Sequence, residues 1–286
     1  MMKMAAKARS GSFRVTRNPV RFPAHARLFS SHVEAATAAA AAPLPVMRKG
    51  ADTMSAQEQQ IFKSAVTKAI ADGTYSRLVH IHADMAHDMH TMPDMRAGTL
   101  RFLPWHRMFL VTFEQAMRAF EPTFFLPHWR WMDQTSLPAW IAGFKPTGVI
   151  DTNGKKIRIT RAPGKNPQAR TLPTSATIQS TVMNQTDYRS FTLALEGAKP
   201  YGAHNLVHMW VNGTMSNVPI APADPVFWMH HGEIDRLWAI WAKAHPGQVP
   251  NLSGADAVLD PWPEHVSDVL TTQVGSYSYS YDLMTL

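Results

Sequence analysis

Two stretches rich in histidine, well separated along the chain, predict helices that present imidazoles to a shared interior site. The first runs from His80 to His106, and the second from His204 to His231. His204 and His208 are four residues apart, so on a helix their rings lie on one face, one turn apart. A lone pair at this spacing is a weak indication of a metal site. His231 strengthens it, because a neighbouring helix can supply a third nitrogen.

The residues around these stretches suggest how the imidazoles are held. Asp235 lies one turn after His231, and a metal-bound histidine usually offers its second ring nitrogen to a carboxylate or a carbonyl. We therefore expect Asp235 to orient one of the imidazoles. In the first stretch five histidines compete for three places, and His106 follows Pro104, where we expect a helix to begin. The five are His80, His82, His87, His90 and His106.

Hydrophobic periodicity predicts a mainly α-helical fold, a helical bundle with the metal site in its core and few short strands. Ser55 and Glu58 form a capping-box pattern before apolar residues at helical spacing. A small hairpin is expected around Asn153 and Gly154. The other predicted helices cover 76–88, 104 or 105–120, 187–196, 203–211 and 231–243.

Length and composition limit the class of protein. A chain of 286 residues without cysteine can build one full core but no disulfide and no thiolate metal site. No apolar stretch is long enough to span a membrane. The formal charge of +7 comes largely from the segment between Lys3 and Arg27, and no basic stripe with interleaved aromatic residues predicts nucleic-acid binding.

The first fifty residues differ in composition from the rest. They are basic and rich in serine and alanine, and Glu34 is the one acidic residue among them. We interpret 1–50 as a disordered or targeting leader and 51–286 as a single domain. An organelle-type leader, a cleavable signal and a plain disordered tail all fit, so we expect a soluble protein that is cytoplasmic or exported.

Three motifs resemble the copper signatures of one family. They are F-L-P-W-H-R at 102–107 followed by Phe113-Glu114, D-P-x-F-W-x-H-H-x-x-x-D at 224–235, and L-P-x-W-x-W at 126–131. Together they are similar to the motifs of the type-3 dicopper family, which comprises tyrosinases, catechol oxidases and haemocyanins.

The resemblance implies the ligands of two copper ions. His204, His208 and His231 match the second site, and His82 and His106 match the first and third ligands of the other. Most relatives place the middle ligand where this chain has Ala97. We choose His90 for that role, with His87 as the alternative. His230 is interpreted as a wall of the site and His80 as structural.

The resemblance also implies the chemistry. Neutral imidazoles suit copper in both oxidation states, whereas a two-zinc hydrolase would normally need an anionic ligand. The expected reaction uses dioxygen to convert phenols to o-quinones. A catechol oxidase without activity on monophenols and a non-enzymatic oxygen carrier are the alternatives. Because the chain ends at Leu286 with no domain to cover the pocket, we favour an enzyme. A helper protein could load the copper.

Two further roles follow from the resemblance. Glu196 and Asn205 are expected to hold a water molecule that takes the proton from a monophenol, with Asn205 directly following a ligand. The closing tyrosines of the chain are expected to pack on Arg48. They are Tyr277, Tyr279 and Tyr281.

Overall fold

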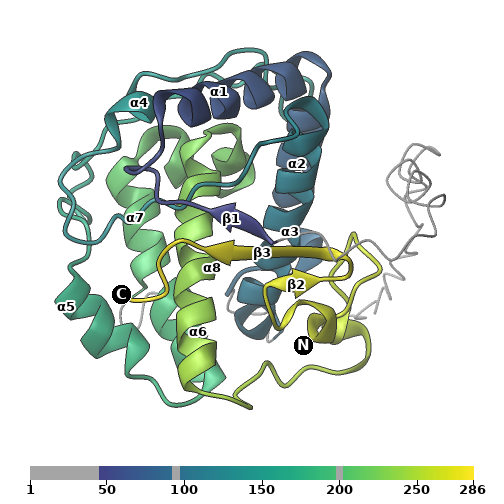
Figure 1. Cartoon of the computed structure of the whole chain (residues 1–286), viewed down its shortest axis with the longest axis vertical. Coiled ribbons are helices and arrows are strands. Elements are labelled where there is room, and N and C mark those ends of the chain that lie inside the picture. The colour runs from purple at the N-terminus through teal and green to yellow at the C-terminus, as the bar shows by residue number, and fades with distance from the viewer. Residues whose placement is uncertain (1–44, 92–96, 198–201) are drawn as a thin grey trace, which may run out of the picture. The chain divides into compact units, whose positions relative to one another are not determined.

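A computed structural model describes residues 45–91, 97–197 and 202–286 (Figure 1). Most of the predicted leader therefore lies outside the described residues. Its last part does not, because strand β1 (Val46–Arg48) falls within the range we interpreted as leader. β1 pairs with a strand near the C-terminal end of the chain, a partner that local sequence does not indicate.

The first two helices carry the start of the first histidine stretch. Helix α1 (Ala56–Ala71) begins at the predicted capping box, with Ser55 and Glu58 bonding reciprocally. Helix α2 (Thr74–Ala83) ends five residues before the predicted end at 88. A 3₁₀ turn, Met85–His87, follows it, and Asp84 caps this turn through the backbone N–H of Ala86. The prediction missed this capping aspartate, which takes the chain out of the helix.

Helix α3 (Gly98–Phe120) begins earlier than the predicted start at Pro104 or Trp105. The prediction placed Pro104 in the first turn because proline has no N–H to donate to the carbonyl four residues before it. In the structure that carbonyl belongs to Leu100, and it accepts a hydrogen bond of 3.0 Å from the hydroxyl of Tyr188 instead. A contact from another helix thus makes an internal proline tolerable.

The second half of the chain contributes the remaining helices. Asp187 caps α6 (Tyr188–Glu196) as predicted, and α7 (Ala203–Val211) matches its predicted range. Helix α8 (Val226–Ala244) begins five residues before the predicted start at 231, because the Asp224 carboxylate accepts from the N–H of Val226. Shorter elements are α4 (Ala139–Ala142), α5 (Ser175–Ile178) and a π-helical turn (Gln179–Met183).

The strands form one small sheet in the order β1-β3-β2 (Figure 1). Strand β3 (Tyr277–Tyr281) pairs parallel to β1 and antiparallel to β2 (Gln273–Val274). The prediction for Arg48 is confirmed for two of the tyrosines, because its guanidinium lies 3.5 Å from the ring centre of Tyr279 and donates to the hydroxyl of Tyr281. The predicted hairpin is a single antiparallel bridge between Ile150 and Lys156.

The core forms around α3 and α8, whose side chains are buried along most of their length. Phe113 and Trp228 stack across this contact with ring centres 3.9 Å apart. Helices α1 and α6 also pack on α3. The mainly α-helical class is confirmed, and the packing of α3 against its neighbours brings the histidine stretches together.

Candidate metal centre

The first histidine cluster joins α2, the loop after it and α3. His82 comes from the last turn of α2, His90 from the loop, and His106 from the third turn of α3. One ring nitrogen from each lies within 4.8 Å of the others. The Nε2 atoms of His82 and His90 are 3.3 Å apart. The three imidazoles can therefore hold one metal ion.

The second cluster joins α7 and α8. His204 and His208 lie one turn apart on α7, as their spacing predicts, and face His231 on α8. The Nε2 atom of His231 lies 3.1 Å from that of His204 and 3.4 Å from that of His208. A second metal ion fits among these three nitrogens.

The two clusters meet in one interior site. The rings of His106 and His231 stack with their centres 4.5 Å apart and their planes 17° from parallel. The rings of His90 and His204 lie 6.3 Å apart. Two ions held by these clusters would therefore be neighbours, able to act on one bound molecule.

The hydrogen bonds of the rings show which nitrogens are free to bind a metal. Nδ1 of His106 donates to the carbonyl of Phe102 at 2.8 Å, and Nδ1 of His208 donates to that of Met215 at 2.6 Å. In a neutral ring this assigns the lone pair to Nε2. Nε2 of His106 is buried without a hydrogen-bond partner among the described residues. Lone pairs converging in a protein interior repel one another unless a cation lies between them.

Burial keeps these imidazoles neutral. Removal from water lowers the pKa of His82, His106, His204 and His231 well below the usual value of 6.5. The same effect lowers the pKa of His208 to about 4. At neutral pH the rings are therefore in the form that binds metals.

The other histidines of the first stretch lie outside its cluster. His87 stacks on Trp105, with ring centres 6.0 Å apart, and contributes no nitrogen to either cluster. His80 bonds to the carbonyl of Ile150 at 3.0 Å and lies in neither cluster, which agrees with the structural interpretation. The structure thus brings His90, and not His87, to His82 and His106.

His230 lies at the edge of the second cluster. A nitrogen of its ring is within 4.8 Å of the ligand atoms of the other three histidines, so its ring lies directly against the site. Its ring stacks on that of His204, with centres 5.2 Å apart and planes 14° from parallel. This packing is consistent with the predicted wall.

The prediction that Asp235 orients an imidazole is wrong. Its Oδ1 accepts from Nε of Arg107 at 2.6 Å, and its Oδ2 accepts from Nη1 of Arg48 and from the hydroxyls of two tyrosines. One helical turn separates Asp235 from His231, but the carboxylate turns toward the arginines on α3 and β1. Arg107 is a structural partner that the sequence reasoning missed, although it directly follows His106 in the copper-like motif.

Glu196 and Asn205 contact opposite clusters. The carboxylate of Glu196, at the end of α6, accepts from Nδ1 of His90 at 3.1 Å. The side-chain oxygen of Asn205 lies 2.9 Å from Nδ1 of His204. Glu196 is 3% exposed, whereas Asn205 faces solvent.

Sequence reasoning also missed Phe227, whose ring stacks on that of His231 with centres 4.1 Å apart. Its centre is 5.0 Å from that of His82, so it packs between the two clusters. The position of Phe227 in the D-P-x-F motif could have indicated that it lies at the site.

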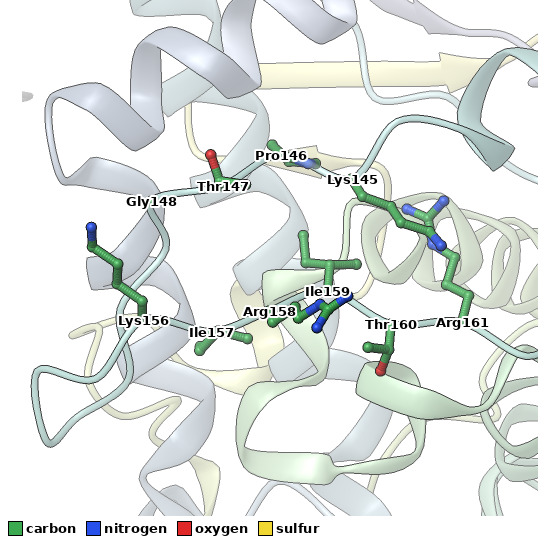
Figure 2. Close-up of a pocket in the computed structure, with 10 residues that line it drawn as sticks. All are labelled: Lys145, Pro146, Thr147, Gly148, Lys156, Ile157, Arg158, Ile159, Thr160 and Arg161. Carbon is green, nitrogen blue, oxygen red and sulfur yellow. The ribbon is translucent and has the colours of Figure 1, made fainter.

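A surface pocket lies apart from these residues. It has a volume of about 490 Å³, and Figure 2 shows that residues 145–148 and 156–161 line it. None of its lining residues is a histidine. It carries Lys145, Lys156 and Arg158 on an exposed surface, and it is not the metal centre.

The donor set indicates which metals fit. In the described part of the chain, both clusters consist of imidazoles alone, without a carboxylate. Neutral nitrogen ligands suit copper in both oxidation states. Fold and site together define a helical protein that holds two adjacent metal ions through histidines of its core.

Comparisons with known proteins give the family. A family model described as the common central domain of tyrosinase matches residues 72–162 and 150–244. A tyrosinase of Streptomyces galbus is 30% identical over 278 residues, which cover 82% of this chain and 99% of that protein. The chain belongs to the tyrosinase family, whose members bind two copper ions through histidine clusters such as those present here.

Solved structures share the fold. A functional unit of octopus hemocyanin matches with a TM-score of 0.62 and 21% identity, covering 84% of this chain and 69% of that one. A polyphenol oxidase from Thermothelomyces thermophila matches with a TM-score of 0.55 and 18% identity, covering 83% and 88%. Among the described residues no helix has the length and apolarity needed to cross a membrane.

Proposed function

We propose that this protein uses dioxygen to oxidise phenols to o-quinones and that it accepts monophenols as well as o-diphenols. The observation that carries the proposal is the pair of three-histidine clusters meeting at His106 and His231, whose rings lie 4.5 Å apart. The similarity to a Streptomyces tyrosinase over nearly that protein's whole length supports the same class of reaction.

Six histidines would hold the copper ions. His82, His90 and His106 bind the first, and the second is bound by His204, His208 and His231. When bound, the two coppers supply the site that activates dioxygen and exchanges electrons with the substrate. The imidazoles come from four helices and one loop and would hold the two ions close together, and the apolar ring of Phe227 packs between the two clusters.

A monophenol must lose its hydroxyl proton before its oxygen can bind near the metals, and two side chains lie where they can assist. Glu196 is an acceptor beside His90, and Asn205 is an exposed polar group beside His204. We assign them a shared water that takes this proton. The hydrogen bonds to Glu196 leave one lone pair of Oε2 for such a water.

Substrate would approach from the side of α7. Asn205 is exposed and His208 partly so, whereas His82 and His106 are 1% and 2% exposed. The phenol ring therefore meets the second cluster first. Because every ligand of the first cluster is buried, a helper protein that delivers copper is a reasonable partner, and direct uptake of copper ions by the metal-free protein would show that none is required.

Oxygen consumption tests the proposal. The copper-loaded protein is supplied with tyrosine and, separately, with a catechol, and quinone formation is followed in parallel. Turnover of both substrates is expected. Turnover of the catechol alone would identify a diphenol oxidase, and reversible oxygen uptake without turnover would identify a carrier. Loss of monophenol turnover with retained catechol turnover is expected for Asn205→Ala, and equal retention of both would remove Asn205 from the proton step.

A further inference from the structure

We propose that Glu196 is a positioning residue that holds His90 in place as a ligand of the first copper. Thr91 and Gly98 help to fix the same segment of the chain. The inference rests on the proposed role of His90 as a ligand. It assigns Glu196 a task that is separate from proton transfer and that can be measured without substrate.

His90 needs contacts from outside its own loop because it does not lie on a helix. The other five proposed ligands lie on α2, α3, α7 and α8. His90 follows a 3₁₀ turn and Asp88, whose φ of 50° turns the chain into the left-handed region. His90 is nevertheless only 9% exposed, and its Nε2 lies 3.3 Å from Nε2 of His82. Contacts from outside the loop must fix this position.

The carboxylate of Glu196 provides three of these contacts. Oε1 accepts from Nδ1 of His90 at 3.1 Å and from the backbone N–H of Thr91 at 2.9 Å. Oε2 accepts from the hydroxyl of Thr91. The Thr91 hydroxyl has a single proton, which it gives to Glu196. In its 3.1 Å contact with the hydroxyl of Thr99 it is therefore the acceptor, and this contact joins the loop to α3. One side chain of α6 thus fixes both the ring and the backbone.

Gly98 provides the space for the loop. A Cβ built on Gly98 would lie 1.9 Å from the carbonyl oxygen of His90 and 2.8 Å from Oδ1 of Asp88. No Cβ tolerates a backbone atom at that distance, so a larger residue at the start of α3 would move the loop. This close approach of the loop to Gly98 does not involve Glu196, and it too shows that the loop carrying His90 must be held in one position.

The charge of Glu196 distinguishes its role from packing. Among the proposed ligands, Nδ1 of His106 and of His208 donates to backbone carbonyls, and Nδ1 of His204 faces an amide oxygen. His90 has a carboxylate partner. A carboxylate on Nδ1 fixes the tautomer with the lone pair on Nε2 and makes the ring a stronger donor, and loss of such a partner typically weakens metal binding about 10–100-fold. The affinity of the first site should therefore depend on Glu196.

The test is a copper titration of the metal-free full chain in competition with a chelator. Wild type is compared with Glu196→Gln, with Gly98→Ala and with Glu121→Gln as control, because Glu121 bonds to Ser64 and Lys68 on the surface. We expect Glu196→Gln to weaken one of the two coppers about 10–100-fold and to leave the other unchanged. Gly98→Ala should weaken the same copper, and the control should match wild type.

Selective weakening separates positioning from a general structural role, because a fold defect would weaken both coppers together. Thr91→Val adds a milder case that keeps the contact between Glu196 and Nδ1, and we expect a smaller loss at the same site. Two coppers bound by Glu196→Gln with wild-type affinity would overturn the inference even if the wild type oxidises phenols. A wild type that binds two coppers but oxidises no phenol would overturn the proposed function and leave the inference standing.

Discussion

Arg107 and Asp235 form a buried ion pair that joins α3 to α8, with Nε 2.6 Å from Oδ1. The two residues follow closely on His106 and His231, the ligands through which the clusters meet. Asp235 also binds Arg48 and the hydroxyls of Tyr279 and Tyr281. A single carboxylate therefore holds the small sheet and both central helices in register with the metal centre.

Replacement of Asp235 by Asn should destabilise the protein strongly. It leaves Arg107 without a counter-charge in the interior, and breaking one side of a buried pair costs about 3–5 kcal/mol. The free energy of unfolding in urea measures this. Asp72→Asn is the control, since Asp72 and Arg77 form an exposed pair worth no more than about 1 kcal/mol. Equal losses in the two variants would contradict the prediction.

Replacement of His90 or of His87 separates the two candidates for the middle ligand. His90→Ala should lower the tightly bound copper from two ions to one, because two imidazoles remain in the first cluster. His87→Ala should keep both ions, since His87 belongs to neither cluster and lies against Trp105 and Asp84. Copper analysis after gel filtration gives the stoichiometry. Loss of copper from the His87 variant alone would reverse the assignment.

Acid should destabilise the metal-free protein well before its carboxylates titrate. Burial lowers the pKa values of six histidines at the metal centre in the folded state, that of His208 to about 4, while unfolded histidines titrate near 6.5. The other five are His82, His106, His204, His230 and His231. Below about pH 6.5 the unfolded chain binds protons that the folded chain does not, so stability falls as pH falls. At pH 5.5 the expected loss is about 1 kcal/mol for each such histidine.

Urea unfolding at pH 7.5 and 5.5 measures the loss, and equal stability at the two values would contradict it. A second decline is expected near pH 4 and below. This decline comes from two buried carboxylates. Arg107 holds the pKa of Asp235 below its usual value, and Arg236 holds the pKa of Glu233 below its usual value. Stability contributed by these carboxylates is present above their unfolded pKa values and is lost as pH falls through the folded ones.

The hydroxyl of Tyr188 should contribute to the stability of the fold because Pro104 cannot donate a hydrogen bond to the carbonyl of Leu100. Tyr188→Phe leaves the carbonyl of Leu100 without a donor inside α3, at a cost of about 1–3 kcal/mol. In a Pro104→Ala background the new backbone N–H can bond to that carbonyl, so the same change should cost less. A double-mutant cycle in thermal or urea unfolding gives the coupling. Additive effects would show that the two residues act independently.

Local sequence predicted the helices whose signals are local. The capping box at Ser55, the cap at Asp187 and the range of α7 are all contained within a few residues of the element they define. The start of α3 was missed for the opposite reason. Its N-cap residue, Ala97, has no capping side chain, and the contact that makes Pro104 tolerable comes from Tyr188, far along the chain.

In the site, too, features set by local sequence were predicted, and features set by contacts between distant residues were not. The spacing of His204 and His208 predicted their shared helix face, and the motifs selected His106 and His231. The partner of Asp235 could not be read from spacing, because a residue one turn from a ligand can turn toward either neighbour. The position of His90 depends on a carboxylate at Glu196 and on the missing Cβ of Gly98, neither of which lies in the pattern of histidines.

The parallel pairing of β1 with β3 has a consequence for synthesis of the chain. Arg48 leaves the ribosome early, yet its partner Tyr281 lies 233 residues later. Both carboxylate partners of its guanidinium, Glu114 and Asp235, are translated before Tyr281, whereas β1 has no strand beside it until the end of synthesis, and its exposed edge is free to pair wrongly. Every histidine of the two clusters is translated before this closing strand, so the protein can gather its ligands while its first strand still awaits a partner.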